Sequence, residues 1–415
     1  MRSVPILIVG GGAAGMMAAA AVSGCGKKAL IIEKMNQLGK KILATGNGRC
    51  NYTNLRQKPE FYHVDETDGV WEILKRFDEK QAISFFKDAG VYPRERDGYV
   101  YPMSLQAVSL RNCLQRKIDK KWVHLEEEVL EITQNMSELG KCTGFVVKTD
   151  KDRYLAKKVI ITAGGMASKC HGSNGACFDI LKSLGHTIIK PVPALTWLKI
   201  EEKYTKLWAG VRVNGKIKAY DENKNELAED SGELQLVSTG ISGIPVFQIS
   251  RYISRQLEKT KRAYIEADFL PGFSKDELLG EILRRRQDEQ ELEASYILEG
   301  IMNNKLVDAI LSRAEINKNS KLKDLTIEQC EQICSHIKKF EAEVKDTAGF
   351  DNAQVTCGGV SRREVNFKDM SSKVCKGLYL AGEIVDVDGI CGGYNLQWAW
   401  SSGYIAGISA AGGKQ

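Results

Sequence analysis

The chain has 415 residues, more than one ordinary hydrophobic core accommodates, so we expect two or three domains. Hydrophobic residues make up 43% of the sequence and charged residues 27%, a balance that excludes an intrinsically disordered protein. The 59 basic and 53 acidic residues give a net charge of +6, which permits an anionic partner without requiring one.

The cysteines and the apolar runs exclude further classes. Eleven cysteines, an odd number without paired C-x-x-C spacing, indicate reduced thiols and neither a disulfide framework nor a zinc site. No run of about 18 apolar residues is present to span a membrane. The apolar N-terminal run ends in glycines and continues into a helical pattern, unlike a signal peptide. We therefore expect a cytoplasmic protein with no bound metal and no membrane association.

Residues 6–15 are typical of a dinucleotide-binding fold. An apolar strand leads into Gly10, Gly12 and Gly15, whose G-x-G-x-x-G spacing favours a tight turn, close approach of backbone N–H groups to a pyrophosphate, and close helix packing. A second predicted strand over 28–32 ends in Glu33, about 20 residues further on, where a carboxylate binds a ribose hydroxyl. An ordinary glycine-rich turn is the alternative interpretation.

Between residues 39 and 121 the sequence predicts loops and helices. Residues 39–54 mix small, amide and basic side chains without periodicity, which indicates an ordered loop. Apolar residues at helical spacing predict one broken helix or two short ones over 69–89, and a further helix over 105–121. The aromatic and charged residues 92–102 between them are predicted to form a loop.

The pattern changes to strands over 122–164, consistent with a small meander. Its last strand, 159–163, is almost entirely apolar and runs into Gly164 and Gly165. That is typical of a buried parallel strand, and we expect it to return to the nucleotide site.

Pro191 and Pro193 mark a change of composition. Residues 191–272 are predicted to form an inserted antiparallel β-rich domain, in which Asn214-Gly215 between alternating residues indicates a type I′ hairpin.

A helical subdomain is predicted over 273–345. Ser274 with Glu277, and Thr326 with Gln329, are capping boxes ahead of apolar helical patterns. On this division, residues 1–190 form the first segment of the cofactor-binding domain. Residues 346–415 return through the edge of the β domain and form its second segment.

The closing segment carries a second glycine-rich region. A predicted strand ends in Gly382 and Glu383, and Gly392-Gly393 precedes a helix of small residues over 396–410. An acid after such a strand can bond a ribityl chain, and the free N–H groups of the helix would stabilise negative charge on a reduced isoalloxazine. We therefore favour FAD over a resident nicotinamide. A glycine-rich helix start without a ligand is the alternative.

Two blocks are specific enough to indicate a family: residues 45–54, TGNGRCNYTN, and residues 382–395, GEIVDVDGICGGYN. Residues 10–15, 184–186, 232–234 with 239–243, and 358–407 support them. On these motifs the chain resembles the BaiN/RdsA-like FAD-binding flavoproteins, also called the aminoacetone oxidase family, over essentially its full length. The resemblance implies an α/β fold, in which a Rossmann-like FAD-binding domain in two chain segments carries an inserted antiparallel β domain and a helical subdomain.

The resemblance implies FAD as the cofactor. NAD(P)H, if it is the electron donor, must bind transiently, because the sequence has one dinucleotide fingerprint. The expected FAD contacts are Gly10, Gly12, Ala13, Ala14, Gly15, Glu33, Lys34, Lys41, Thr45, Gly46, Asn47, Arg49, Cys50, Val129, Ala163, Gly164, Gly382, Glu383, Gly392, Gly393, Tyr394, Asn395 and Leu396.

A flavin performs the hydride chemistry, so the protein positions the substrate and supplies one proton. Cys50, Cys391 and His171 are the candidate acids. The structural alternatives are a packed, inert thiol for each cysteine and a surface loop position for the histidine. Arg49 is expected to contact a phosphate, and Tyr394 either stacks on a ring or fills the core.

Family membership implies divergent chemistry. Members have been associated with aminoacetone oxidation, with reductive steps of bile-acid dehydroxylation, and with reduction of uridine in ribosomal RNA to dihydrouridine. Residues 166–172 lack the tyrosine and proline often found there, and Cys391 stands where a threonine is expected, so the substrate stays open.

The first hypothesis is reduction of a uridine in large-subunit ribosomal RNA, favoured by the family association and by basic clusters at 40–58, 111–121 and 251–262. A solvated face is the alternative interpretation of these clusters. A small-molecule oxidase or reductase acting on an amine, ketone or steroid is the second, and a non-catalytic flavin-binding scaffold is the third. The expected partner is therefore an RNA or a small molecule, with no DNA, and the oligomeric state is left open.

Overall fold

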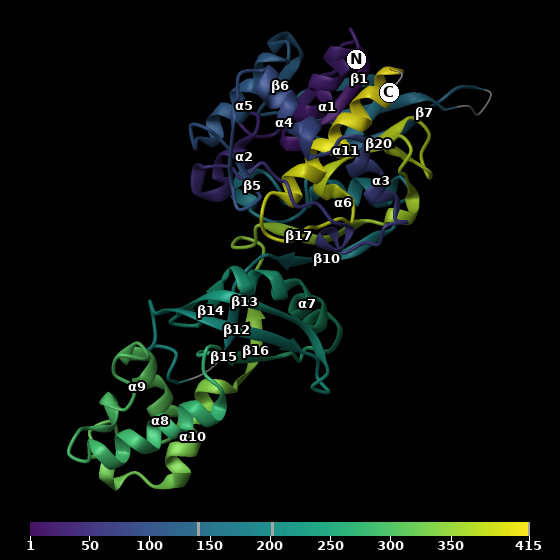
Figure 1. The fold of residues 1–415 in the computed structure, drawn as a ribbon. Coiled ribbons are helices and arrows are strands. Elements are labelled where there is room, and N and C mark those ends of the chain that lie inside the picture. Colours follow the sequence, from purple (N-terminus) through teal and green to yellow (C-terminus); the bar gives the residue numbers. More distant parts are fainter. Residues whose placement is uncertain (139–141, 201–202, 414–415) are drawn as a thin grey trace. The chain divides into compact units, whose positions relative to one another are not determined.

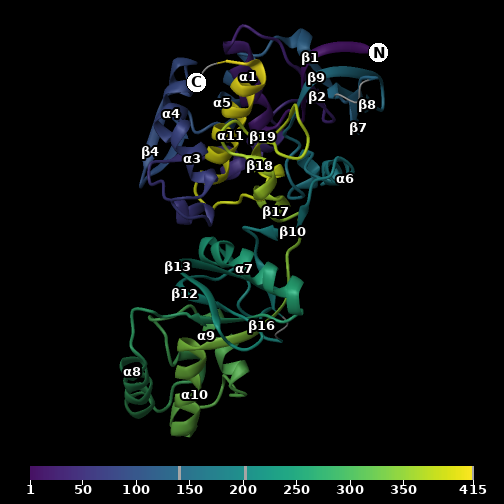
Figure 2. The same cartoon turned by 90° about the vertical axis from the view of Figure 1, so that its right-hand side faces the viewer.

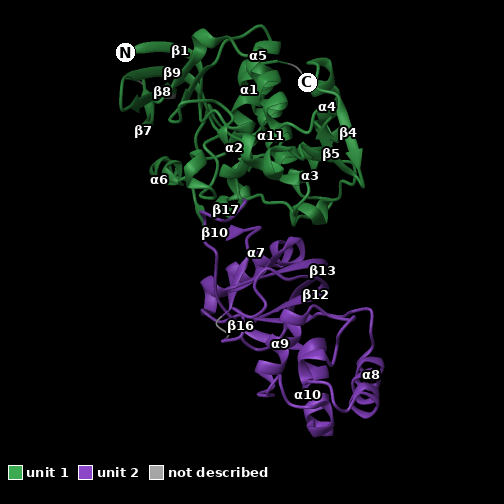
Figure 3. Ribbon diagram, turned by 90° about the vertical axis from the view of Figure 1, so that its left-hand side faces the viewer, with its two compact units in different colours: residues 1–191, 355–415 green, residues 192–354 purple. Residues whose placement is uncertain are grey.

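The computed structural model describes residues 1–138, 142–200 and 203–413, and these residues fall into two compact units (Figure 3). Unit 1 combines residues 1–191 with 355–415, and unit 2 contains residues 192–354. Unit 1 is thus built from two chain segments, as the predicted fold class requires.

The main sheet of unit 1 has a parallel centre. Its strands follow the order β18-β19-β20-β9-β1-β2-β6, and β7 and β8 extend β9 as an antiparallel meander. Strand β9 runs parallel to both β1 and β20, which confirms the buried parallel strand predicted before Gly164. The strands are β1 (Arg2–Val9), β2 (Leu30–Glu33), β6 (Val123–Leu125), β7 (Val129–Met136), β8 (Cys142–Thr149), β9 (Arg153–Ile161), β18 (Val365–Asn366), β19 (Ser371–Ser372) and β20 (Leu378–Leu380).

Helices α1 and α11, from opposite ends of the sequence, pack side by side in unit 1 (Figures 1 and 2). A Cβ on Gly403 would lie 2.5 Å from the carbonyl oxygen of Ala14, so glycine permits this close approach. The helices of unit 1 are α1 (Ala13–Gly24), α2 (Lys40–Ala44), α3 (Gly69–Arg76), α4 (Glu79–Asp88), α5 (Ala107–Arg116), α6 (Ala176–Ser183) and α11 (Tyr394–Ala411).

Two stretches predicted as loops contain regular structure. The 39–54 loop prediction was wrong for its first part, because α2 forms there, too short for periodicity to reveal it. The loop predicted over 92–102 is a hairpin of β4 (Pro93–Arg96) and β5 (Tyr99–Pro102), to which β3 (Thr53–Asn54) adds a further strand. Asp97 and Gly98 turn this hairpin with φ of 54° and 88°, both in the left-handed region that a type I′ turn requires.

A closed antiparallel barrel forms the first part of unit 2. Its strands follow the order β11-β14-β13-β12-β15-β16. They are β11 (Leu198–Ile200), β12 (Arg212–Tyr220), β13 (Glu226–Val237), β14 (Gly240–Gly243), β15 (Tyr264–Asp268) and β16 (Phe340–Thr347). β16 therefore overlaps the end of the range predicted as helical. β10 (Ile188–Ala194) pairs with β17 (Val355–Val360) where the chain leaves and re-enters unit 1.

The hairpin predicted at Asn214-Gly215 was wrong. Both residues lie inside β12 and pair with Glu233 and Gly232 of β13. A Cβ on Gly215 would lie 2.7 Å from the carbonyl oxygen of Asp268 on the neighbouring strand, so this glycine permits close packing of strands and does not make a turn.

The helices of unit 2 share one buried apolar cluster with the barrel. Both predicted capping boxes are present, at Ser274–Glu277 before α8 and at Thr326–Gln329 before α10. The helices are α7 (Ile244–Thr260), α8 (Lys275–Asp288), α9 (Asn304–Arg313) and α10 (Ile327–Lys338). Among the described residues, no helix combines the length and apolar character needed to cross a membrane.

Candidate functional site

The turn between β1 and α1 has the geometry that its glycines predict. Gly10 has φ of 97°, and a Cβ there would lie 2.8 Å from the carbonyl oxygen of Thr162. A Cβ on Gly15 would lie 2.0 Å from the carbonyl oxygen of Gly10. Nothing lies within 4 Å of the Cβ position of Gly12, so open space faces the start of α1, where Ala13 and Ala14 form the first turn.

Glu33 closes this turn at the end of β2. Its Oε2 accepts a hydrogen bond from the Gly11 N–H at 2.6 Å, and its Oε1 accepts one from the Met35 N–H at 2.8 Å. Burial raises the pKa of the Glu33 carboxyl, while these two backbone donors and Lys34 oppose that rise. The carboxylate is therefore fixed beside the glycine turn.

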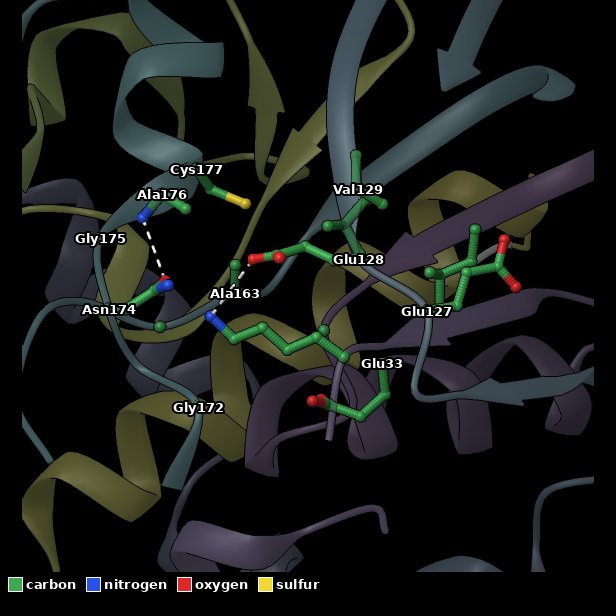
Figure 4. Close-up of a pocket in the computed structure, with 15 residues that line it drawn as sticks. Glu33, Glu127, Glu128, Val129, Ala163, Gly172, Asn174, Gly175, Ala176 and Cys177 are labelled. Carbon is green, nitrogen blue, oxygen red and sulfur yellow. Dashed lines mark hydrogen bonds and ion pairs between the residues drawn. The ribbon is translucent and has the colours of Figure 1, made fainter. Parts of the chain in front are cut away.

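A pocket beside Glu33 collects residues from several elements (Figure 4). Six of the residues predicted to contact the cofactor line it: Gly10, Glu33, Lys34, Val129, Ala163 and Gly164. The Lys34 ammonium lies 3.8 Å from the carboxylate of Glu128, which also lines the pocket. β1, β2, β7 and the residues after β9 thus meet at one end of the parallel sheet.

A buried network behind this pocket was missed by the sequence reading. The Glu127 carboxylate is buried and accepts hydrogen bonds from Thr149 Oγ1 at 2.7 Å and Tyr154 Oη at 2.8 Å. His124 Nδ1 lies 3.0 Å from its other oxygen. The three partners and Glu127 are spread from residue 124 to residue 154, and no local motif marks them. They fix the chain just before Val129.

An ion pair joins the closing glycine region to α2. Lys41 Nζ lies 2.9 Å from Glu383 Oε2 and 3.3 Å from the Ala167 carbonyl oxygen. The other oxygen of Glu383 accepts from the Thr356 N–H at 2.8 Å. A Cβ on Gly382 would lie 2.8 Å from Cβ of Ala14, so residues 382–383 sit against the first turn of α1.

The two family blocks lie side by side. Asn54 Nδ2 donates to the Gly392 carbonyl oxygen at 3.0 Å, and Thr53 Oγ1 donates to Gln397 Oε1 at 2.6 Å. A Cβ on Gly393 would lie 2.7 Å from the carbonyl carbon of Thr53. The end of the first block therefore lies against the start of α11 and the predicted contacts Gly392, Gly393, Tyr394, Asn395 and Leu396, whereas the predicted contacts Thr45, Gly46, Asn47, Arg49 and Cys50 precede it in the chain.

The start of α11 leaves backbone donors available. Its N-cap, Gly393, makes no side-chain cap hydrogen bond, and its first turn contains no acidic residue. The Asn395 side chain instead holds the preceding loop, since it both accepts from the N–H and donates to the carbonyl oxygen of Gly389 at 2.8 Å. The positive end of an 18-residue helix is thus free of a protein cap.

The comparison with known proteins decides the family. The HI0933-like protein Rossmann domain family matches residues 4–409. The chain belongs to this family. The BaiN/RdsA-like resemblance is thereby confirmed, and the protein is a flavin-dependent oxidoreductase.

Relatives match over nearly the full length. A 3-dehydro-bile acid delta(4,6)-reductase of Clostridium scindens is 39% identical over 406 residues, covering 97% of this chain and 98% of the relative. A ribosomal RNA dihydrouridine synthase of Haemophilus influenzae is 28% identical over 409 residues, 97% of each chain. The 3-ketosteroid-delta4-(5alpha)-dehydrogenase structure from Rhodococcus jostii aligns with 100% of this chain and 97% of its own at a TM-score of 0.49 and 13% identity.

The residues of this HI0933-like chain fit a flavin dinucleotide. The open space at Gly12 would admit a pyrophosphate, and Glu33 stands where a ribose hydroxyl would be bound. In the second region, Asn51 Oδ1 is buried and has no hydrogen-bond partner among the described atoms. A buried amide oxygen of this kind normally has a partner, and a donor on a bound ligand would supply it.

The candidate acids differ in their surroundings. Cys50 is fully buried, with φ of 56°, and burial raises its pKa to about 12. Cys391 is partly exposed beside Gly392. His171 lies on the turn after β9, where burial and the nearby Lys40 and Lys41 lower its pKa.

Tyr394 fills the core. It is 4% exposed and makes edge contacts with Phe61 and Tyr62, at ring-centroid distances of 5.2 and 5.7 Å. Its hydroxyl donates to the Arg56 carbonyl oxygen at 2.9 Å. Tyr394 can therefore contact a cofactor only through its backbone, at the start of α11.

For the predictions about cysteines and metals, the structure gives findings on its described residues only. Seven cysteines are thiols that form no disulfide: Cys25, Cys50, Cys113, Cys170, Cys177, Cys330 and Cys334. No cluster of His, Cys, Asp or Glu within 1–138, 142–200 and 203–413 is placed to hold a metal ion.

Proposed function

We propose that this protein reduces a carbon–carbon double bond conjugated to a carbonyl group, and that its substrate is a uridine in large-subunit ribosomal RNA. The observation that carries the RNA assignment is the positive charge around residues 45–54. Arg49 is exposed within this block, Arg56 is exposed two residues beyond it, and Lys40 precedes it. Cations placed in this way favour a phosphate-rich substrate.

The activities named for the two relatives support the reaction class. Uracil carries its C5–C6 double bond next to the C4 carbonyl, and a 3-oxo steroid with double bonds at positions 4 and 6 is conjugated in the same sense. In each case one hydride and one proton add across the double bond. The same cofactor site can therefore serve either substrate.

The proposed roles follow from position. Bound FAD supplies the hydride, and NAD(P)H is the proposed source of its electrons. The N-terminus of α1 binds the pyrophosphate, and Glu33 binds a ribose hydroxyl. The N-terminus of α11 stabilises negative charge. Cys391, partly exposed beside this helix start, donates the proton to the second carbon.

The test is a reconstituted reaction. The FAD-loaded protein is incubated with NADPH and protein-free large-subunit ribosomal RNA from a strain lacking this gene, and dihydrouridine is measured by mass spectrometry of the digested nucleosides. We expect dihydrouridine to appear at a single position. Unchanged RNA, combined with an unchanged dihydrouridine content in the deletion strain, would refute the RNA assignment.

A steroid-type reductase is the second candidate, favoured by the 39% identity to the bile-acid reductase. The same protein is offered a 3-oxo-4,6-diene bile acid under identical conditions. Rapid reduction of this compound, without any dihydrouridine formed in RNA, would select this candidate.

A further inference from the structure

The sheet formed by β3, β5 and β4 places arginines and tyrosines on one face. Directly opposed residues of antiparallel strands point to the same side of a sheet. Arg94 is paired with Tyr101, and Arg96 is paired with Tyr99. Tyr99 is also paired with Asn54 on its other side. Arg96, Tyr99 and Asn54 therefore form one row across the sheet, with Arg94 and Tyr101 forming the next pair on the same face.

The opposite face is packed against the core at β3 and β5, while Glu95 of β4 is exposed there. Val100, which alternates with the two tyrosines, is 1% exposed, and Thr53, which pairs with it, is fully buried. The arginines of the first face are exposed, and the tyrosines are partly exposed. β4 lies at the periphery of unit 1 (Figure 3), and the exposure of its two arginines makes the arginine–tyrosine face an outer surface. We call Arg94, Arg96, Tyr99 and Tyr101 the outer face.

The outer face continues into the candidate site. The Asn54 amide donates to the Gly392 carbonyl oxygen at 3.0 Å. A Cβ on Gly392 would lie 3.0 Å from the ring of Tyr99. Arg56 borders the same row, since a Cβ on Gly98 would lie 3.2 Å from its side chain. The row thus ends at the turn that carries Cys391.

We propose that the outer face binds the single-stranded RNA segment that flanks the target uridine. Arg94 and Arg96 bind its phosphates, and the Tyr101 ring stacks on a base. Interleaved cations and aromatic rings on a sheet are what single-stranded nucleic acid requires, because the cations follow the backbone and every base offers a flat surface for stacking. This inference rests on the proposed function.

The acidic residue at the hairpin turn does not oppose this assignment. Asp97 Oδ2 lies 3.7 Å from Arg96 Nε, and both side chains are exposed. An exposed pair of this length is weak, so a phosphate can replace the carboxylate.

The first experiment measures RNA binding as a function of salt. The FAD-loaded wild type and Arg94→Ala/Arg96→Ala are titrated with a fluorescent single-stranded RNA of the sequence around the modified uridine. We expect the double variant to bind roughly tenfold more weakly, with the slope of log K against log salt reduced by about 1.4 for two lost phosphate contacts. Arg153→Ala/Lys157→Ala, which removes two exposed cations of β9, is the matched control and should bind as the wild type.

The second experiment separates stacking from charge. Tyr101→Ala should weaken binding roughly tenfold without changing the salt slope, because base–aromatic stacking carries no charge. Tyr101→Phe should bind as the wild type, since it keeps the ring. Retention of flavin absorption by each variant shows that the fold is intact.

The outcomes distinguish this inference from the proposed function. If the wild type forms dihydrouridine and the Arg94/Arg96 and Tyr101 variants bind RNA as tightly as the wild type, RNA binding by the outer face is refuted. The proposed function then stands. If the wild type neither binds nor reduces RNA, both are refuted. Weaker RNA binding by both variants, with a reduced salt slope only in Arg94→Ala/Arg96→Ala, supports RNA binding by the outer face.

Discussion

Lys41 and Glu383 form an ion pair with 2.9 Å between Nζ and Oε2, across 342 positions of sequence. The Lys41 side chain is 26% exposed and that of Glu383 is 20% exposed, so the pair is partly shielded from water. It joins α2, which precedes the first family block, to the strand end that opens the second. This contact holds together the two halves of the candidate cofactor site.

We expect Glu383→Gln to lower the free energy of unfolding by about 1–2 kcal/mol, because it leaves the partly buried Lys41 ammonium without its counter-charge. Urea denaturation measures the change. The matched control is Glu72→Gln, which removes an exposed pair with Lys75 and should change stability by less than about 0.5 kcal/mol. Equal effects in the two variants would contradict the role of the Lys41–Glu383 pair.

Gly12 and Gly15 should respond differently to alanine. Gly15→Ala places a Cβ 2.0 Å from a backbone oxygen, so we expect about 1–3 kcal/mol of destabilisation even without FAD. Gly12→Ala meets no protein atom within 4 Å, so the apoprotein should keep its stability while FAD binding weakens at least tenfold. Thermal unfolding and flavin titration measure the two effects. Unchanged FAD affinity in Gly12→Ala would place the pyrophosphate elsewhere.

The free energy of unfolding should fall at high pH, in part because the Cys50 thiol is buried. Its folded-state pKa of about 12 lies above the ordinary value of 9.0, so between these values only the unfolded thiol ionises. The contribution of the Cys50 thiol to the free energy of unfolding is fully present below pH 9. It falls by about 2 kcal/mol between pH 8 and pH 10.5. We expect Cys50→Ala to show a correspondingly shallower decline in urea denaturation. Cys170→Ala, at an exposed cysteine, should keep the wild-type slope.

Replacing Cys391 should separate the two half-reactions. We expect Cys391→Ala to accept electrons from NADPH at the wild-type rate while substrate reduction slows by about 10²–10⁴, because only the second half-reaction needs the proton. Stopped-flow absorption of the flavin measures both rates. Cys50→Ala is the comparison, and a larger loss in that variant would assign the proton to the buried thiol instead.

Local sequence signals predicted the local parts of the site. The Gly10–Gly15 turn and the capping boxes at Ser274 and Thr326 each depend on residues a few positions apart, so spacing alone reveals them. The contacts Lys41–Glu383 and Asn54–Gly392 join segments more than 330 residues apart. Only the folded chain brings these pairs together, and a single sequence carries no spacing that marks them.

The type I′ turn illustrates how one rule fails and succeeds. Asn214-Gly215 matches the rule, yet continuous pairing with both neighbouring strands keeps it inside β12. Asp97-Gly98 also matches, but its flanking prolines, arginines and tyrosines do not resemble alternating strands. Pairing with both neighbouring strands keeps Asn214-Gly215 extended, whereas the unusual flanking composition conceals the turn at Asp97-Gly98 from a sequence-based prediction.

The packing of α1 against α11 governs when the cofactor site can form in the cell. Ala14 and Gly403 are in contact, and at about 5–20 residues per second roughly 20–80 s separate their synthesis. During that interval the alanine-rich side of α1 has no α11 to cover it. Flavin incorporation is consequently a late event in biogenesis, and a nascent chain that stalls before residue 390 exposes an apolar helix for chaperones to bind.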